Sequence, residues 1–187
     1  MSVHRGAIAL AILIAAAPLS VRAEVNIEEV RGGVLAQSCC GPGNNREDGV
    51  GLNAEIVFAS PEFLSFAGSP RPLAGATVAT DSDATSHIYA GLEWRFNLHP
   101  RFFVSGGGGG AIHNGETDDF DPVADANRLS STLFFGCRAV FRINGDVGYR
   151  INDRFNAMFS WSHISNAGLC RENEGLDHLG FRLGYEF

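Results

Sequence analysis

The sequence predicts an all-β fold, an eight-stranded antiparallel β-barrel that spans a membrane. After residue 23, short runs of β-forming residues alternate with Gly, Pro, Asn and Asp, without a long amphipathic helical pattern. Beyond the N-terminus no segment holds about 18 consecutive apolar residues, so only a closed barrel could carry this chain across a bilayer. Eight runs of strand length can be counted, the smallest number common among membrane barrels.

Residues 1–23 have the three parts of a secretory signal peptide. Arg5 lies in a short n-region, residues 7–17 form an apolar core, and residues 21–23 offer a small-residue cleavage site. The apolar run ends at Pro18 and is too short for a helix that spans about 30 Å of bilayer. We therefore predict an exported chain, cleaved before Glu24, whose residues 24–187 form a single β-barrel domain.

The mature chain is acidic. Removing residues 1–23 takes away two arginines and no acidic residue, which leaves 12 basic and 21 acidic residues and a formal charge of −9. Nucleic-acid binding depends on basic patches that neutralise phosphates, so this balance excludes nucleic acid as an expected partner.

Tight turns and longer loops are expected to alternate as the connections between the strands. The strands cover residues 27–37, 49–59, 72–80, 86–97, 102–113, 129–151, 155–165 and 175–187. The sixth run is too long for one plain strand, and Asn144-Gly145 within it could mark a bulge or a turn. Residues 60–71 form a long inner connection with a short helical turn near residues 61–67.

Five consecutive glycines, Gly106 to Gly110, lie inside the fifth predicted strand. No Gly-Lys-Ser/Thr follows them, so they do not form a phosphate loop. Glycine weakens a strand but permits bending and close approach of another group. Tight barrel curvature is the favoured interpretation, and a groove on the barrel wall for an acyl chain is the alternative.

The cysteines and acidic residues predict neither a metal site nor a cofactor. Four cysteines allow three pairings, and we expect Cys39 or Cys40 to bond to Cys170, with free thiols as an equal alternative. Neither a CxxC nor a paired-histidine spacing accompanies them, which argues against zinc. The acidic loop at residues 114–128 lacks EF-hand spacing, which favours a solvated loop.

The last two strands place polar residues among aromatic ones. Side chains alternate faces along a strand, so His163 and Ser165 share the face of Phe159 and Trp161. The apolar residues from Leu179 to Phe187 have the same parity as Asp177. Opposed residues on antiparallel strands have Cβ atoms about 5 Å apart, so Asp177 could meet His163 if the register aligns them.

These residues could form a nucleophilic site. A serine attacks an ester when a histidine takes its proton and a carboxylate holds the imidazole. Asn166, or the backbone N–H groups of Ala167 and Gly168, could stabilise the oxyanion, and Glu174 is a possible substitute acid. From parity alone, a strand-end capping hydroxyl is the favoured description of Ser165, and an interfacial belt residue that of His163; the motif described next reverses this preference. The remaining histidines of the mature chain are expected on the surface or in the lumen: His87, His99, His113 and His178.

This stretch resembles the PagL-type outer-membrane lipid A 3-O-deacylases, whose hallmark is His-x-Ser-Asn-Ala-Gly followed by an Asn-acid-Gly-x-acid segment. The matching residues are His163, Ser165, Asn166, Ala167, Gly168, Asn173, Glu174, Gly175 and Asp177. The usual acid of the family is Glu, which is one methylene longer than Asp177. The resemblance implies a serine esterase that releases an ester-linked acyl chain, at position 3, from lipid A of lipopolysaccharide, with Ser165 as nucleophile, His163 as base and Asp177 as acid.

The C-terminal aromatic, Phe187, resembles the assembly signal of outer-membrane barrels. The chain is therefore expected in the bacterial outer membrane, surrounded by its lipids. A soluble lipocalin-like barrel would turn His163 and Ser165 inward, but Arg182 and Glu186 on the opposite face suit a polar lumen. A non-enzymatic barrel with a structural or adhesive role is the alternative function, and a homodimer is left open.

Overall fold

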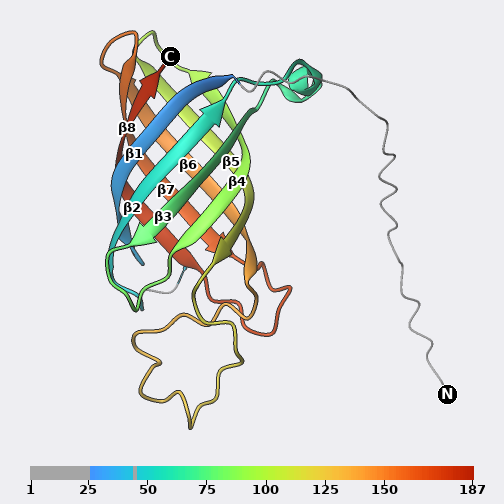
Figure 1. The fold of residues 1–187 in the computed structure, drawn as a ribbon, viewed down its shortest axis with the longest axis vertical. Helices are drawn as coiled ribbons and strands as arrows, with labels where there is room; N and C mark the ends of the chain where they lie inside the picture. The colour runs from blue at the N-terminus through green and yellow to red at the C-terminus, as the bar shows by residue number, and fades with distance from the viewer. Residues whose placement is uncertain (1–25, 44–45) are drawn as a thin grey trace, which may run out of the picture.

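The computed structural model describes residues 26–43 and 46–187, so the predicted signal peptide lies outside the described residues. Eight antiparallel strands close into one barrel in chain order, with β8 pairing back to β1 (Figure 1). The strands are β1 (Ile27–Gln37), β2 (Gly49–Phe58), β3 (Arg71–Ala79), β4 (His87–Asn97), β5 (Phe102–His113), β6 (Ala139–Arg150), β7 (Phe155–Ser165) and β8 (Leu176–Glu186). The predicted all-β, eight-stranded barrel is confirmed.

Seven of the eight predicted strands agree with the structure to within one residue at each end. The sixth is wrong over residues 129–138, which belong to the loop before β6. Their apolar run from Leu133 to Phe135 is almost fully buried beneath the outer loops, so β-forming residues pack there without pairing as a strand. Asn144-Gly145 marks neither a bulge nor a turn, because β6 keeps one register with β7 from Phe141 to Arg150.

Along the strands, apolar side chains face outward and polar side chains face the lumen, which is the reverse of a soluble barrel. On β2, Leu52 is 53% exposed and faces outward, whereas Asn53 and Glu55 are buried in the lumen. This arrangement places apolar side chains against lipid and polar ones inside, which is typical of membrane barrels. Among the described residues, no helix is both long and apolar enough to cross a membrane.

A network of buried charges fills the lumen. Arg31 donates to Glu29, Glu55 and Glu93 at 2.7–2.9 Å, and all four side chains are fully buried. Buried charges are tolerated where each is paired and hydrogen-bonded. The network therefore ties together β1, β2 and β4 across the inside of the barrel.

Alternate glycines of the run from Gly106 to Gly110 have different surroundings. Gly107 and Gly109 point inward, where a Cβ would overlap the carbonyls of Leu92 and Ala90 on β4. This close approach fits the curvature interpretation. Gly108 and Gly110 point outward by strand alternation. Because they have no side chains, the outer surface of the barrel is shallower at these two positions.

The connections separate the two ends of the barrel. The long loops β1–β2, β5–β6 and β7–β8 gather at one end, and the C-terminus lies at the other (Figure 1). Outer-membrane barrels have short periplasmic turns and longer outer loops, so the loop-rich end is the outer one. The predicted helical turn in the β2–β3 connection is confirmed as η1 (Glu62–Ala67), a 3-10 helix at the periplasmic end.

Candidate active site

The register of the last hairpin brings two predicted site residues together. β7 and β8 pair so that His163 lies directly opposite Asp177. Ser165 follows His163 by two residues and therefore shares its lipid-facing side. The three side chains meet near the outer end of β7 on the outside of the barrel.

These three side chains form a continuous chain of hydrogen bonds. His163 Nδ1 lies 3.1 Å from Asp177 Oδ1, and His163 Nε2 lies 3.0 Å from Ser165 Oγ. With the ring proton on Nδ1, the imidazole donates to the carboxylate and accepts from the serine hydroxyl. The ring of Trp161 stacks on the imidazole, with 6.3 Å between centroids and 12° between planes. The hydrogen bonds to Asp177 and Ser165 are the contacts that set the orientation of the imidazole.

Asp177 is buried although its parity directs it outward. Its side chain is only 1% exposed because residues 38–43 of the β1–β2 loop fold over the outside of β8. Gly43 N–H donates to Asp177 Oδ2 at 2.5 Å, and Ser38 N–H donates to the Asp177 carbonyl at 2.8 Å. A Cβ on Gly41 or Gly43 would overlap the carboxylate. Sequence reasoning missed this contact, although Gly41-Pro42-Gly43 was a signal that side chains are excluded there.

The three predicted oxyanion residues differ in whether their donor groups are already engaged in hydrogen bonds. Asn166 is buried, and its Nδ2 donates to the carbonyls of Phe135 and Glu172 at 2.5 Å each. Its Oδ1 accepts the Gly168 N–H at 2.8 Å, so both groups hold the β7–β8 loop. Ala167 adopts a left-handed backbone with φ of 55°. Within the described residues, its N–H is the member of this set without an acceptor.

Glu174, the possible substitute acid, is engaged by two other loops. Its Oε2 accepts the Phe134 N–H at 2.8 Å, and its Oε1 pairs with Arg46 at 2.5 Å. The carboxylate therefore links the β1–β2, β5–β6 and β7–β8 loops. Asp177, rather than Glu174, is the acid that contacts His163.

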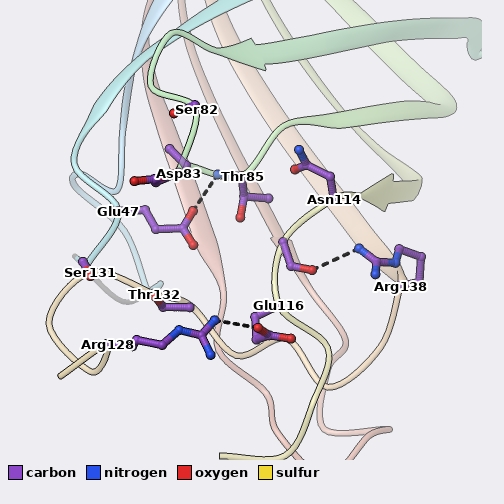
Figure 2. Close-up of a pocket in the computed structure, with 12 residues that line it drawn as sticks. Glu47, Ser82, Asp83, Thr85, Asn114, Glu116, Arg128, Ser131, Thr132 and Arg138 are labelled. Carbon is purple, nitrogen blue, oxygen red and sulfur yellow. Dashed lines mark hydrogen bonds and ion pairs between the residues drawn. The ribbon is translucent and has the colours of Figure 1, made fainter. Parts of the chain in front are cut away.

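Glu47, a buried carboxylate of the β1–β2 loop, ties the outer loops together beside a polar pocket (Figure 2). Its two oxygens accept the N–H groups of Thr85 at 2.8 Å and Leu133 at 3.0 Å. Burial raises the pKa of the Glu47 carboxyl. The adjoining pocket, of about 470 Å³, is also lined by Glu116 and Arg128, which pair with each other. None of the predicted catalytic residues lines it.

The predicted bond from Cys39 or Cys40 to Cys170 is wrong, whereas the equal alternative, that some cysteines are free thiols, is confirmed. Cys137 bonds to Cys170, which joins the end of the β5–β6 loop to the β7–β8 loop, while Cys39 and Cys40 are free thiols. The β1–β2 loop lies over Asp177, whereas Cys170 belongs to the part of the β7–β8 loop that contacts Phe135 through Asn166. Burial raises the pKa of the Cys39 thiol to about 11.

An apolar groove runs along the barrel wall beside Ser165. Phe141 is the strand partner of Ser165, and together with Gly110, Ala139 and Leu169 it lines a hollow of about 360 Å³. A second apolar hollow of about 420 Å³ adjoins it at Gly110 and Ala139 and extends to Ala90 on β4. Gly110 and Ala139 line both hollows, and the small size of these residues leaves space on the outer wall of the barrel.

Within residues 26–43 and 46–187, no group of three or more His, Cys, Asp or Glu side chains is arranged to hold a metal ion. Three of the remaining histidines, His87, His113 and His178, lie in the lumen, and His99 is exposed in the β4–β5 turn.

Comparison with known proteins identifies the family. Residues 72–186 match the family described as Lipid A 3-O-deacylase (PagL). No curated protein is a significant match. Among solved structures, the outer membrane enzyme PagL is similar with a TM-score of 0.59 and 14% identity, over 85% of this chain and 99% of that one.

Two other solved barrels share the fold. The N-terminal β-barrel domain of Pseudomonas aeruginosa OprF has a TM-score of 0.51 and 11% identity, over 86% of this chain and 98% of that one. Neisserial surface protein A has a TM-score of 0.50 and 12% identity, over 86% of this chain and 96% of that one. The homodimer that the sequence leaves open finds no support in these comparisons. The family match, which covers more than half of the sequence, shows that this outer-membrane barrel belongs to the lipid A 3-O-deacylase (PagL) family.

Proposed function

We propose that this protein is a serine esterase that hydrolyses an ester-linked acyl chain of lipid A, at position 3, in the outer leaflet of the outer membrane. Family membership supports lipid A deacylation. The observation that carries the serine mechanism is the hydrogen-bonded chain from Asp177 through His163 to Ser165. Position 3 follows from the family's described activity.

The geometry supports acyl transfer in two steps. Ser165 Oγ attacks the ester carbonyl while His163 Nε2 takes the hydroxyl proton. His163 then gives this proton to the departing lipid A hydroxyl, and the acyl chain stays on Ser165. A water molecule, deprotonated by His163, releases the fatty acid and restores the serine. Asp177 stays ionised throughout and stabilises the imidazolium.

The oxyanion needs a donor close to Ser165. The Ala167 N–H follows the nucleophile by two residues and is not used by the described loop contacts. We assign it as the oxyanion donor, with Asn166 and the Gly168 N–H as the groups that hold the turn. Preorganised donors of this kind lower the barrier because they are already oriented toward the developing charge.

The position of the site suits a substrate that stays in the membrane. Polar side chains facing lipid are costly unless they pair with one another or lie near the interface, and this trio does both. The groove beside Ser165 is apolar and could receive the acyl chain while the sugar headgroup remains outside. A non-enzymatic barrel would have no need for this paired trio.

Mass spectrometry of lipid A tests the proposed activity. Outer membranes that contain the inserted chain should show lipid A lacking one ester-linked hydroxyacyl mass, and fragmentation should place the loss at position 3. An unchanged lipid A, with insertion verified by surface proteolysis, would favour the structural or adhesive alternative. Loss from another position would retain the esterase and reject the position.

The identity of the acid can be tested by two matched amide substitutions. Asp177→Asn should lower kcat by about 10²- to 10⁴-fold, because an amide cannot stabilise the imidazolium and favours the wrong tautomer. Glu174→Gln should leave kcat within a few-fold, since Glu174 contacts Phe134 and Arg46 instead. Both rates are measured on purified, refolded protein with lipid A. The reverse ranking would assign the acid to Glu174.

The Gly43 amide should contribute to holding Asp177. Gly43→Pro removes the N–H that donates to Oδ2, and a hydrogen bond to a charged group contributes about 1.5–3 kcal/mol. Proline and alanine both add a Cβ that overlaps the carboxylate, so Gly43→Ala, which keeps the N–H, is the matched control. We expect kcat of the proline variant to fall by about 10-fold or more relative to the alanine variant, with KM little changed, because the lost bond orients the acid rather than the lipid. The heat-dependent gel shift of the barrel checks folding. An unaltered kcat would mean that His163 alone suffices to orient the carboxylate.

A further inference from the structure

The β2–β3 connection at the periplasmic end carries a helix outside the barrel. η1 stands to one side of the barrel, near the end where the C-terminus lies (Figure 1). Its last turn is closed by Gly68, whose N–H donates to Ser65 O at 3.1 Å. The other two periplasmic connections are tight turns, so this segment needs a separate explanation.

A 3-10 helix has three residues per turn, so η1 presents three ridges of side chains. Glu62 and Ser65 form a polar, exposed ridge, while Leu64 and Ala67 form a half-buried one. The third ridge consists of Phe63 and Phe66, which are 70% and 86% exposed. The helix is therefore amphipathic, with an uncovered aromatic edge.

Trp94 fixes η1 against the lipid-facing wall of the barrel. Its neighbour Glu93 is buried in the lumen, so Trp94 faces outward by strand alternation. Trp94 Nε1 donates to the Ala67 carbonyl at 2.8 Å. This bond places the half-buried ridge beside β4, at the depth of the periplasmic rim.

The exposed phenylalanines continue the lipid-facing apolar surface. Phe96 and Leu98, beyond Trp94 in the chain, are 59% and 69% exposed. Aromatic residues gather in such belts where a barrel crosses the membrane–water interface. A helix with one apolar and one polar edge at this depth suits the boundary between headgroups and acyl chains.

We propose that η1 is a membrane-interface anchor, with Phe63 and Phe66 inserted into the periplasmic, phospholipid leaflet beside the barrel. Glu62 and Ser65 face the periplasm. Each phenylalanine ring adds apolar surface that would otherwise contact water. The anchor acts on the leaflet opposite to the one that holds the lipid A substrate, and it is independent of the esterase mechanism.

Site-directed spin labelling tests the assignment of the ridges. Single cysteines replace Phe66 or Ser65 in a Cys39→Ser/Cys40→Ser background, so that the nitroxide reacts at one site while the Cys137–Cys170 disulfide remains. The chains are reconstituted into phosphatidylethanolamine–phosphatidylglycerol vesicles. Collision rates with oxygen, which concentrates in lipid, are compared with those of a water-soluble nickel complex. Phe181→Cys on the lipid-facing wall and Val123→Cys in an outer loop are the two reference sites.

We expect the oxygen-to-nickel ratio at position 66 to lie between those at positions 123 and 181, as an interfacial depth requires, and to exceed the ratio at position 65 several-fold. A ratio at position 66 equal to that at position 123 would overturn the anchor, and would direct attention to a periplasmic protein partner. Equal ratios at positions 65 and 66 would also overturn it, because only an inserted ridge distinguishes them. Phe63→Cys and Glu62→Cys repeat the comparison one turn earlier, should either first variant fail to insert.

Discussion

Ser165→Ala is expected to lower the release of the acyl chain from lipid A by about 10³-fold or more, while the barrel still assembles. The substitution removes only the hydroxyl that His163 Nε2 contacts at 3.0 Å. Ser165 ends β7 at a half-buried, lipid-facing position, so its loss leaves strand pairing intact. The fraction of deacylated lipid A is measured by mass spectrometry, in outer membranes that contain equal amounts of the wild-type protein or the variant.

Ser162→Ala is the matched control for this substitution. Ser162 lies on the same strand but is buried on the lumen side, away from lipid. Its alanine variant should deacylate lipid A at the wild-type rate. Full activity of the Ser165 variant, or equal losses in both variants, would reject Ser165 as the nucleophile.

Arg31→Met is expected to destabilise the barrel by about 3–5 kcal/mol, the largest effect on stability that we anticipate from a single substitution. Arg31 is hydrogen-bonded to Glu29, Glu55 and Glu93, all of which are fully buried. Methionine fills a similar volume but leaves these carboxylates short of a counter-charge. Urea unfolding in phospholipid vesicles, followed by tryptophan fluorescence, measures the change in the free energy of unfolding.

Arg101→Met is the control that separates the loss of any arginine from the loss of the buried charge network around Arg31, as judged by the stability of the barrel. Arg101 lies in the β4–β5 turn and donates to the exposed Tyr149 hydroxyl at 3.0 Å. Its replacement should leave the urea midpoint unchanged, because water replaces the lost partner. Similar midpoints for the two variants would show that the lumen charges contribute little to stability.

The arrangement of the strands could be predicted because it depends on a local repeat. Apolar residues at every second position identify β7 and β8 and place His163, Ser165 and Asp177 on one side. The same reasoning failed at residues 129–138, where Leu133 and its neighbours have strand-forming side chains but are buried beneath loops. Propensity describes a fit to a pleated surface, and tertiary packing can satisfy it in another way.

The loops could not be predicted because they have no such repeat. The Cys137–Cys170 bond and the loop over Asp177 join segments separated by 33 and 134 residues. Their geometry depends on contacts that exist only after the barrel has closed. Gly41 and Gly43 mark an excluded side chain, but only the structure shows that the excluded space belongs to Asp177.

The sequence by itself determined the barrel and the shared lipid-facing side of His163, Ser165 and Asp177, because strand alternation is a property of the local chain. The tertiary structure alone decided the register that sets Asp177 opposite His163. It also decided that Glu174 is held by Arg46 and Phe134, and that a distant loop buries the acid. These outcomes depend on which chain segments approach one another in space, and no periodic pattern in a single segment encodes that approach.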